Sequence, residues 1–187
     1  MIYLTLHLIL AHFIADFPLQ SSRLVKYKQN HLLGIFFHSS VHFIISLLLA
    51  FPFIQSKKLW LSIAVIFTIH SIIDQGKVAI CKHTKFNAFI IYLADQLIHV
   101  AVVCLTSICL LGQVTVDTTS FWALFYSDPS IVSFLLVLVL VTYFYDISKW
   151  VYLNEKKAQP YKRDYKGMIR NALIVIVAFG IYWITLP

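Results

Sequence analysis

Charged residues are scarce in this chain. Only 12% of its 187 residues are Asp, Glu, Lys or Arg, whereas a soluble domain carries about 25%. Hydrophobic residues make up 60% of the chain. This balance excludes an ordinary soluble domain and predicts a polytopic membrane protein. The net charge of +7 therefore does not indicate nucleic acid as a partner, because an excess of Lys and Arg in a membrane protein marks cytoplasmic loops and anionic lipid headgroups.

Cysteine, glycine and proline are also sparse. Cys81, Cys104 and Cys109 fit no zinc or disulfide spacing, so we expect them to be apolar packing residues. The first apolar segment has no basic stretch before it and no clear cleavage site. It also contains His12 and Asp16, and we therefore expect it to remain in the mature protein.

Apolar stretches long enough to cross a bilayer, about 20 residues, recur along the chain. They predict an all-α membrane helix bundle of about six transmembrane helices. The connections between them are polar, and we expect residues 19–30 to form one of these connections. The predicted segments are residues 2–17, 31–53, 59–80, 86–111, 130–153 and 168–186.

The basic residues predict the orientation. Twelve of the fifteen Lys and Arg residues fall in or beside the first, third and fifth connections, whereas the opposite connections contain only Lys57 and Lys58. Because Lys and Arg accumulate in cytoplasmic loops, we expect the basic loops in the cytoplasm and both termini outside. Trp60, Trp122, Trp150 and Trp183 fall near segment ends, as interfacial aromatic residues do.

Four pairs of His and Asp residues are spaced four positions apart within the first four segments. Residues at i and i+4 lie on one face of a helix, and ionisable groups inside a membrane are costly and usually functional. With the predicted orientation, all four pairs fall in the cytoplasmic half of the membrane. The pairs are His12 with Asp16, His38 with His42, His70 with Asp74, and Asp95 with His99.

These five imidazoles and three carboxylates exceed the four ligands of one structural zinc site. They predict one or two divalent ions. If there is only one, the remaining residues would form hydrogen bonds to its ligands. Zinc is the expected ion, with manganese and iron as alternatives. Without a metal, the pairs would form a proton relay or polar contacts that hold the helices together. We expect His7 and His31 to be packing residues and His83 to be solvated.

Polar residues near the pairs are candidates for binding an anionic substrate. Lys77 follows Asp74 by three positions, and Lys26 belongs to the basic connection with Arg23 and Lys28. Gln20 and Gln96 could orient a water or the substrate. The alternative to substrate binding is that these lysines are ordinary basic residues of cytoplasmic loops. For Asp146 we expect a local ion pair with Lys149, one helical turn further on.

The spacing of the pairs indicates a weak internal repeat. His12 and His38 are 26 positions apart, and His70 and Asp95 are 25 positions apart. Segments one and two would then form one hairpin and segments three and four a duplicate of it. We accordingly divide the chain into a metal-site core, residues 1–112, and two further helices with a basic loop, residues 113–187.

Three motifs resemble an uncharacterised family of bacterial integral membrane proteins. They are HxxxDFxLQ from His12 to Gln20, HxxxDxxK from His70 to Lys77, and DQxxH from Asp95 to His99, with His38 between the first two. The resemblance covers residues 1 to about 110 and implies the bacterial cytoplasmic membrane but no activity. The residue types are also similar, more loosely, to those of membrane-bound metal-dependent hydrolases.

Three functions follow from these patterns. The first is a hydrolase of phosphatase or phosphodiesterase type that uses a metal-activated water on an anionic lipid or other amphiphile at the cytoplasmic leaflet. The second is a transporter of divalent metal or protons, because the HxxxD pairs resemble the transport sites of cation diffusion facilitators. The third is a structural membrane protein that a metal holds together. The sequence leaves the oligomeric state open.

Overall fold

The computed structural model describes residues 2–112, 126, 128–154 and 161–185, and these residues form helices and connections without a strand. The predicted all-α bundle is confirmed. The apolar helices are α1 (Ile2–Asp16), α3 (Leu32–Leu49), α4 (Lys57–His83), α5 (Ala88–Thr106) extended by η2 (Ser107–Leu111), α7 (Pro129–Val139) continued by η3 (Leu140–Phe144) and α8 (Tyr145–Asn154), and α9 (Tyr165–Thr185). The short elements are α2 (Ser22–Asn30) and η1 (Phe51–Phe53).

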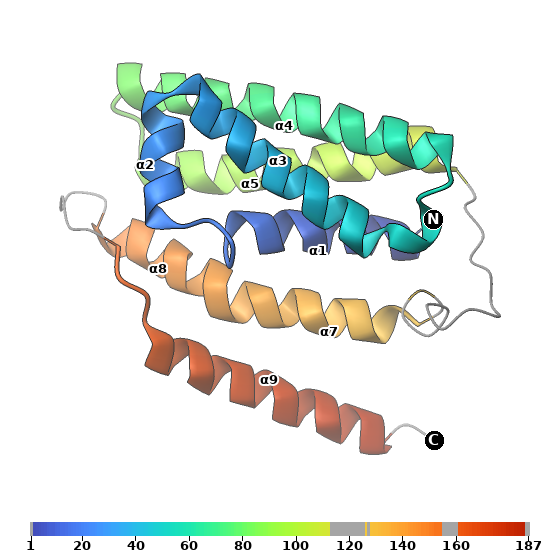
Figure 1. Cartoon of the computed structure of the whole chain (residues 1–187). Helices are drawn as coiled ribbons and strands as arrows, with labels where there is room; N and C mark the ends of the chain where they lie inside the picture. Colours follow the sequence, from blue (N-terminus) through green and yellow to red (C-terminus); the bar gives the residue numbers. More distant parts are fainter. Residues whose placement is uncertain (1, 113–125, 127, 155–160, 186–187) are drawn as a thin grey trace.

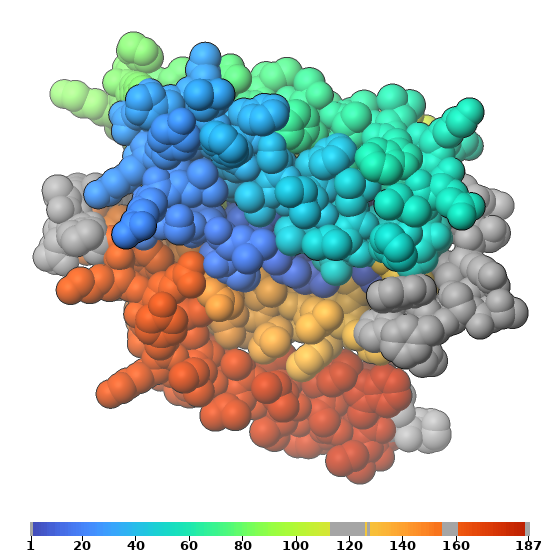
Figure 2. Space-filling model, viewed as in Figure 1, coloured from blue at the N-terminus to red at the C-terminus, as the bar shows by residue number. Residues whose placement is uncertain are grey.

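Four of these helices form the centre of the molecule. Helix α1 packs against α3 and α5, and α4 packs against α3 and α5, so that each of the four contacts two others. The span formed by α7, η3 and α8 lies beside α1 and α5. Helix α9 is the outermost, and the space-filling view shows it as a layer that contacts the rest along one side (Figure 2).

The surface of the bundle is apolar. Five helices are long and apolar enough to cross a membrane, and α1, with 15 residues, is a shorter apolar helix. Leu97, Leu105 and Leu173 are among the large hydrophobic side chains exposed on the helices. A soluble monomer rarely exposes apolar surface on this scale. The described residues therefore have the features of a multi-pass membrane protein.

Both ends of the chain lie at the same end of the bundle, whereas α2 and the turn between α4 and α5 lie at the opposite end (Figure 1). The arrangement brings the basic residues of α2 and of the α4–α5 turn together at one end, as the charge pattern predicts. We call this the basic end. Lys156 and Lys157 of the last basic loop, most of the connection 113–129 and Trp122 fall outside the described residues.

Residues 19–30 connect α1 to α3, as predicted, but most of this connection is the helix α2 rather than a loop. Ser21 caps the helix by accepting a hydrogen bond from the Leu24 backbone N–H, as N-terminal serines commonly do. Leu24, Val25 and Lys28 turn toward the bundle while Lys26 stays exposed. In the sequence, only these three inward-facing residues distinguish a packed helix from a solvated loop. Three residues are too few to give a recognisable helical pattern.

An apolar cluster occupies the half of the bundle that lies away from the basic end. Leu4, Leu8, Leu59, Ile63 and Val103 form a buried apolar cluster between the central helices. We call it the apolar plug. Each of these side chains is at most 2% exposed, so buried apolar side chains occupy this half among the described residues, together with the buried hydroxyl groups of Ser62 and Ser107.

A polar contact attaches α9 to the neighbouring helix within the membrane region. The π-helical turn η3 departs from the usual hydrogen-bond ladder of an α-helix. The Asn171 side chain of α9 donates a hydrogen bond of 2.9 Å to the Val141 carbonyl oxygen in that turn. Hydrogen bonds of this kind hold helices together in a bilayer.

Candidate metal centre

The four predicted pairs meet inside the four-helix centre. Each of α1, α3, α4 and α5 contributes one pair on its inward face, and every member is buried. The i, i+4 spacing explains this, because both residues of a pair project from the same side of their helix. The members are His12, Asp16, His38, His42, His70, Asp74, Asp95 and His99.

One group within the cluster has the geometry of a metal site. His38 Nε2 and His42 Nε2 each lie 3.0 Å from Asp16 Oδ1, and they lie 3.2 Å from each other. Ligands about 2.0–2.1 Å from a tetrahedral zinc are about 3.3 Å apart. His70 completes the group, whose ligand atoms all lie within 4.8 Å of one another. Asp16, His38, His42 and His70 are therefore a buried group that could hold a metal ion.

A second group shares His70 with the first. It consists of His70, Asp74 and His99, again with ligand atoms within 4.8 Å of one another. His70 Nε2 lies 3.7 Å from Asp74 Oδ2 and His99 Nε2 lies 3.9 Å from Asp74 Oδ1. The ring centroids of His70 and His99 are 4.1 Å apart. The second group offers three ligands, which is the number that catalytic zinc sites draw from the protein.

Three buried polar atoms of the cluster have no hydrogen-bond partner among the described residues. They are His70 Nε2, His99 Nε2 and Asp95 Oδ1. A buried donor or acceptor without a partner costs about 1–3 kcal/mol, and most buried polar groups avoid this cost. A cation in the second group would satisfy His70 Nε2 and His99 Nε2, since imidazole nitrogens are metal ligands. Asp95 lies outside both groups, and its Oδ1 atom is 3.5 Å from His99 Nε2. The residues present therefore fit a metal ion.

His12 and Gln96 support the ligands and lie outside both groups. His12 Nε2 lies 3.3 Å from Gln96 Oε1. The Gln96 amide donates to Asp16 Oδ2 at 2.8 Å and to Asp95 Oδ2 at 3.2 Å. The sequence analysis proposed His12 as a ligand and Gln96 as a substrate residue. The geometry gives Gln96 a supporting contact, of the kind that orients ligands at metal sites.

The other residues predicted to bind substrate, Lys77, Gln20 and Lys26, lie in three different environments. The Lys77 ammonium donates to Asp95 Oδ2 at 2.6 Å, and its side chain is 26% exposed. The Gln20 amide lies 3.1 Å from His38 Nε2. Lys26 is exposed on α2, whereas Lys28 is buried and binds Asp74. The sequence grouped Lys28 with its basic neighbours, and only the helical form of α2 reveals which of them faces the cluster.

Asp146, for which a local ion pair was expected, is bound from outside the membrane region. The Tyr161 hydroxyl donates a hydrogen bond to Asp146 Oδ2. Burial, followed by the neighbouring carboxylate of Asp146, raises the pKa of Tyr161. Two residues later, Arg163 donates to the Phe17 and Pro18 carbonyl oxygens at 3.3 and 3.4 Å. The segment before α9 thus contacts the end of α1, next to Asp16.

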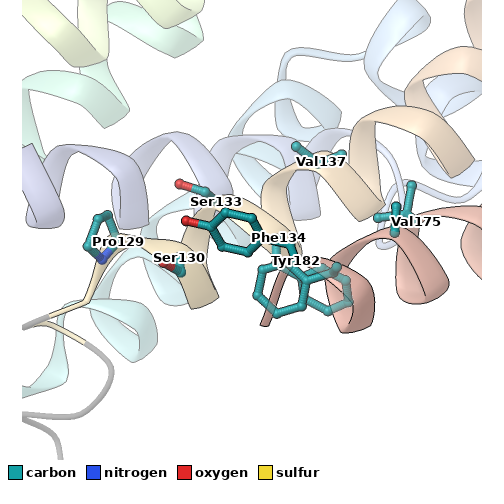
Figure 3. A pocket seen from close by; sticks show the side chains of 9 residues that line it. Pro129, Ser130, Ser133, Phe134, Val137, Val175 and Tyr182 are labelled. Carbon is teal, nitrogen blue, oxygen red and sulfur yellow. The ribbon is translucent and has the colours of Figure 1, made fainter. Parts of the chain in front are cut away.

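An apolar groove of about 490 Å³ lies between α7 and α9. Pro129, Phe134, Val137, Val175 and Tyr182 are among its lining residues (Figure 3). None of the eight His and Asp residues of the cluster lines it. The groove therefore belongs to the outer helices rather than to the metal centre.

Comparison with known proteins gives one match. No curated protein and no solved structure matches the chain significantly. The family model described as "Protein of unknown function (DUF3307)" matches residues 4–127, about two thirds of the 187 residues. The matched range includes all four ligand-bearing helices. The chain therefore belongs to the DUF3307 family of proteins of unknown function.

Proposed function

We propose that this protein is a metal-dependent hydrolase of phosphatase or phosphodiesterase type. Its substrate is an anionic lipid or other amphiphile at the cytoplasmic leaflet of the bacterial inner membrane. The observation that carries the proposal is the pair of ligand groups that share His70, with the partly exposed Lys77 beside them. Zinc is the expected ion, with manganese and iron as alternatives, and one or two ions bind.

A bound ion would supply a hydroxide nucleophile near neutral pH and polarise a phosphoryl oxygen. Asp16, His38 and His42 would hold one ion, and His70, Asp74 and His99 would hold the other, because the single ligand atom of His70 serves one ion at a time. Lys77 has three donors on a flexible stem. It is the residue through which an anionic substrate meets the cluster from outside.

The charge of the cluster supports an anionic substrate. Counted as ionised, Asp16, Asp74 and Asp95 with the ammoniums of Lys28 and Lys77 carry one net negative charge. One divalent ion turns this into one net positive charge, and two ions turn it into three. A buried positive excess is costly without a partner, and a hydroxide with a phosphate ester would compensate it.

Two observations argue against transport of a cation. The apolar plug, which includes Leu8, Ile63 and Val103, fills the bundle on the side away from the basic end. Transport sites also tend to lie between broken helices near the midplane, whereas α4 is continuous through His70 and Asp74.

The topology is part of the proposal. The chain termini share one end of the bundle, and α2 and the α4–α5 turn share the other. Because cytoplasmic loops are rich in Lys and Arg, we infer that the basic end faces the cytoplasm. Asp16 at the end of α1 and Lys77 near the end of α4 would then lie close to the cytoplasmic leaflet.

The test combines metal analysis with an activity assay. Protein purified in detergent is stripped with chelator and reloaded with zinc, manganese or iron, and its metal content is measured by elemental analysis. Hydrolysis is then followed as phosphate release from phosphatidic acid and as release of the alcohol from a soluble phosphodiester. His70→Ala is the test variant. His7→Ala is the control, since His7 is buried on α1 but binds the Tyr3 carbonyl oxygen rather than the cluster.

We expect one or two ions per chain, metal-dependent phosphate release, and loss of both in His70→Ala but not in His7→Ala. Absence of stoichiometric metal in the wild-type protein would overturn the proposal. Metal without hydrolysis, but with metal uptake into proteoliposomes, would replace it with transport. Metal with neither activity would leave a structural ion that holds the helices together.

A further inference from the structure

Helix α2 closes the basic end of the metal centre with a lysine. The Lys28 ammonium lies 3.1 Å from Asp74 Oδ2 and 3.4 Å from Asp74 Oδ1. Its side chain is only 9% exposed. A buried ammonium is stable only with a close partner, and Asp74 is the partner here.

Helix α2 packs closely against α3. A Cβ atom built on Gly34 would lie 2.5 Å from the Lys28 backbone nitrogen and 2.5 Å from the Tyr27 carbonyl carbon. Only glycine permits this approach, since the neighbouring atoms are backbone and cannot rotate away. The contact holds the backbone of Lys28 against the start of α3, so the lysine side chain rather than the helix is free to move.

Lys28 and the second ligand group compete for the same carboxylate. Asp74 Oδ2 is 3.1 Å from the Lys28 ammonium and 3.7 Å from His70 Nε2. Asp74 Oδ1 is 3.4 Å from Lys28 and 3.9 Å from His99 Nε2. A divalent ion ligated by Asp74 would take over the charge that Lys28 now pairs with, and it would repel the ammonium.

We propose that metal binding turns Lys28 into a phosphoryl-binding residue. An ion at His70, Asp74 and His99 releases the Lys28 ammonium from Asp74. The freed ammonium then binds the phosphoryl oxygens of the substrate together with Lys77, which lies one helical turn beyond Asp74. This inference rests on the proposed hydrolase function and adds the group that recognises the phosphate and the condition under which it does so.

The proposal predicts an order of binding. Without the ion, Lys28 neutralises Asp74 and has no charge to offer an anion. With the ion, the site gains positive charge and the ammonium is free, so the same lysine serves the substrate. Anion binding at the site therefore requires the metal, and removal of Lys28 makes metal binding easier because its competitor is gone.

The experiment measures binding of methylphosphonate, a phosphoryl compound that cannot be hydrolysed. Its affinity is determined by calorimetry for the metal-free and the zinc-loaded full chain in detergent. The test variants are Lys28→Met and Lys77→Met. Lys82→Met is the control, because Lys82 is an exposed lysine on α4, the helix of Lys77, and has no role in the proposed site. Lys28→Arg keeps the charge and shows whether any loss comes from misfolding.

We expect methylphosphonate to bind only the zinc-loaded protein. A hydrogen bond to a charged group is worth about 1.5–3 kcal/mol, so each test variant should lose about tenfold to a hundredfold in affinity. Lys82→Met should match the wild type, and Lys28→Arg should keep most of the affinity. Zinc should bind the Lys28→Met variant more tightly than the wild type. A short-chain phosphatidic acid that binds more tightly than methylphosphonate would identify a lipid headgroup as the source of the phosphate, and equal affinity a soluble one.

The proposal fails if methylphosphonate binds the metal-free protein equally well, or if Lys28→Met leaves both affinities unchanged. If zinc binds stoichiometrically but methylphosphonate does not bind at all, the lysine proposal falls while metal-dependent hydrolysis of another anion survives. If zinc does not bind, the hydrolase proposal falls first.

Discussion

Replacing His70 with leucine gives the sharpest test of the metal centre. His70 belongs to both ligand groups, and its Nε2 atom has no hydrogen-bond partner among the described residues. In the metal-free protein this atom costs about 1–3 kcal/mol. Leucine is of similar volume and has no polar atom, so the substitution removes that cost with little repacking. We therefore expect metal-free His70→Leu to be as stable as the wild type or more stable by about 1 kcal/mol.

The metal-loaded protein should respond in the opposite way. A four-ligand structural zinc site binds with about 10–16 kcal/mol, or about 3 kcal/mol per ligand, so losing one ligand raises the Kd about a hundredfold. At a zinc concentration of about 1,000 times the wild-type Kd, zinc stabilises the wild type by about 4 kcal/mol. The same concentration is about 10 times the Kd of the variant and stabilises it by about 1.4 kcal/mol.

The assay is unfolding in detergent with and without zinc. His7→Leu is the control, because His7 is buried on α1 and stacks on Tyr126 with centroids 4.1 Å apart, away from the cluster. It should lose stability by breaking its hydrogen bond to the Tyr3 carbonyl oxygen but keep the full zinc-dependent gain. An unchanged zinc-dependent gain in His70→Leu would refute the ligand assignment. A metal-free loss of more than about 2 kcal/mol, the range for a disrupted buried polar contact, would show that His70 is satisfied without a metal.

Two further predictions concern the elements that surround the ligands. Gly34→Ala should displace α2 from α3, because the new Cβ would overlap α2 backbone atoms. We expect a stability loss of about 1–3 kcal/mol in denaturant unfolding. A stability equal to that of the wild type would show that the packing of α2 on α3 adjusts to the added methyl group. Arg163→Ala should weaken zinc binding by about tenfold, because Arg163 binds the end of α1 next to Asp16. Loss of contacts that support metal ligands has an effect of this size at other metal sites. Arg170→Ala is its control on α9, and equal zinc affinities in the two variants would contradict the effect.

The sequence by itself determined the environment and the eight candidate ligands. Few charges and long apolar stretches leave no soluble fold available, since the exposed leucines of α5 and α9 need lipid rather than water. The i, i+4 spacing of the His and Asp pairs is a local property of a helix, so each pair was bound to share a face. The concentration of Lys and Arg at one end follows from the connections alone.

The tertiary structure decided how the pairs divide. Spacing along a helix does not tell which pairs face each other, and the packing of α1 on α3 and α5 sets that choice. It leaves His12 with Gln96 and unites Asp16 with His38 and His42. Both outcomes were open from the sequence, because they depend on contacts between residues far apart in the chain.

The role of α2 also came only from the structure. As a loop, residues 19–30 would have offered three equivalent basic residues to the solvent. As a helix seated on Gly34, the segment buries Lys28 and exposes Lys26. The sequence thus determined that a basic connection borders the metal centre, through local charge and hydropathy. Only the packing of a backbone against a glycine decided which lysine reaches Asp74.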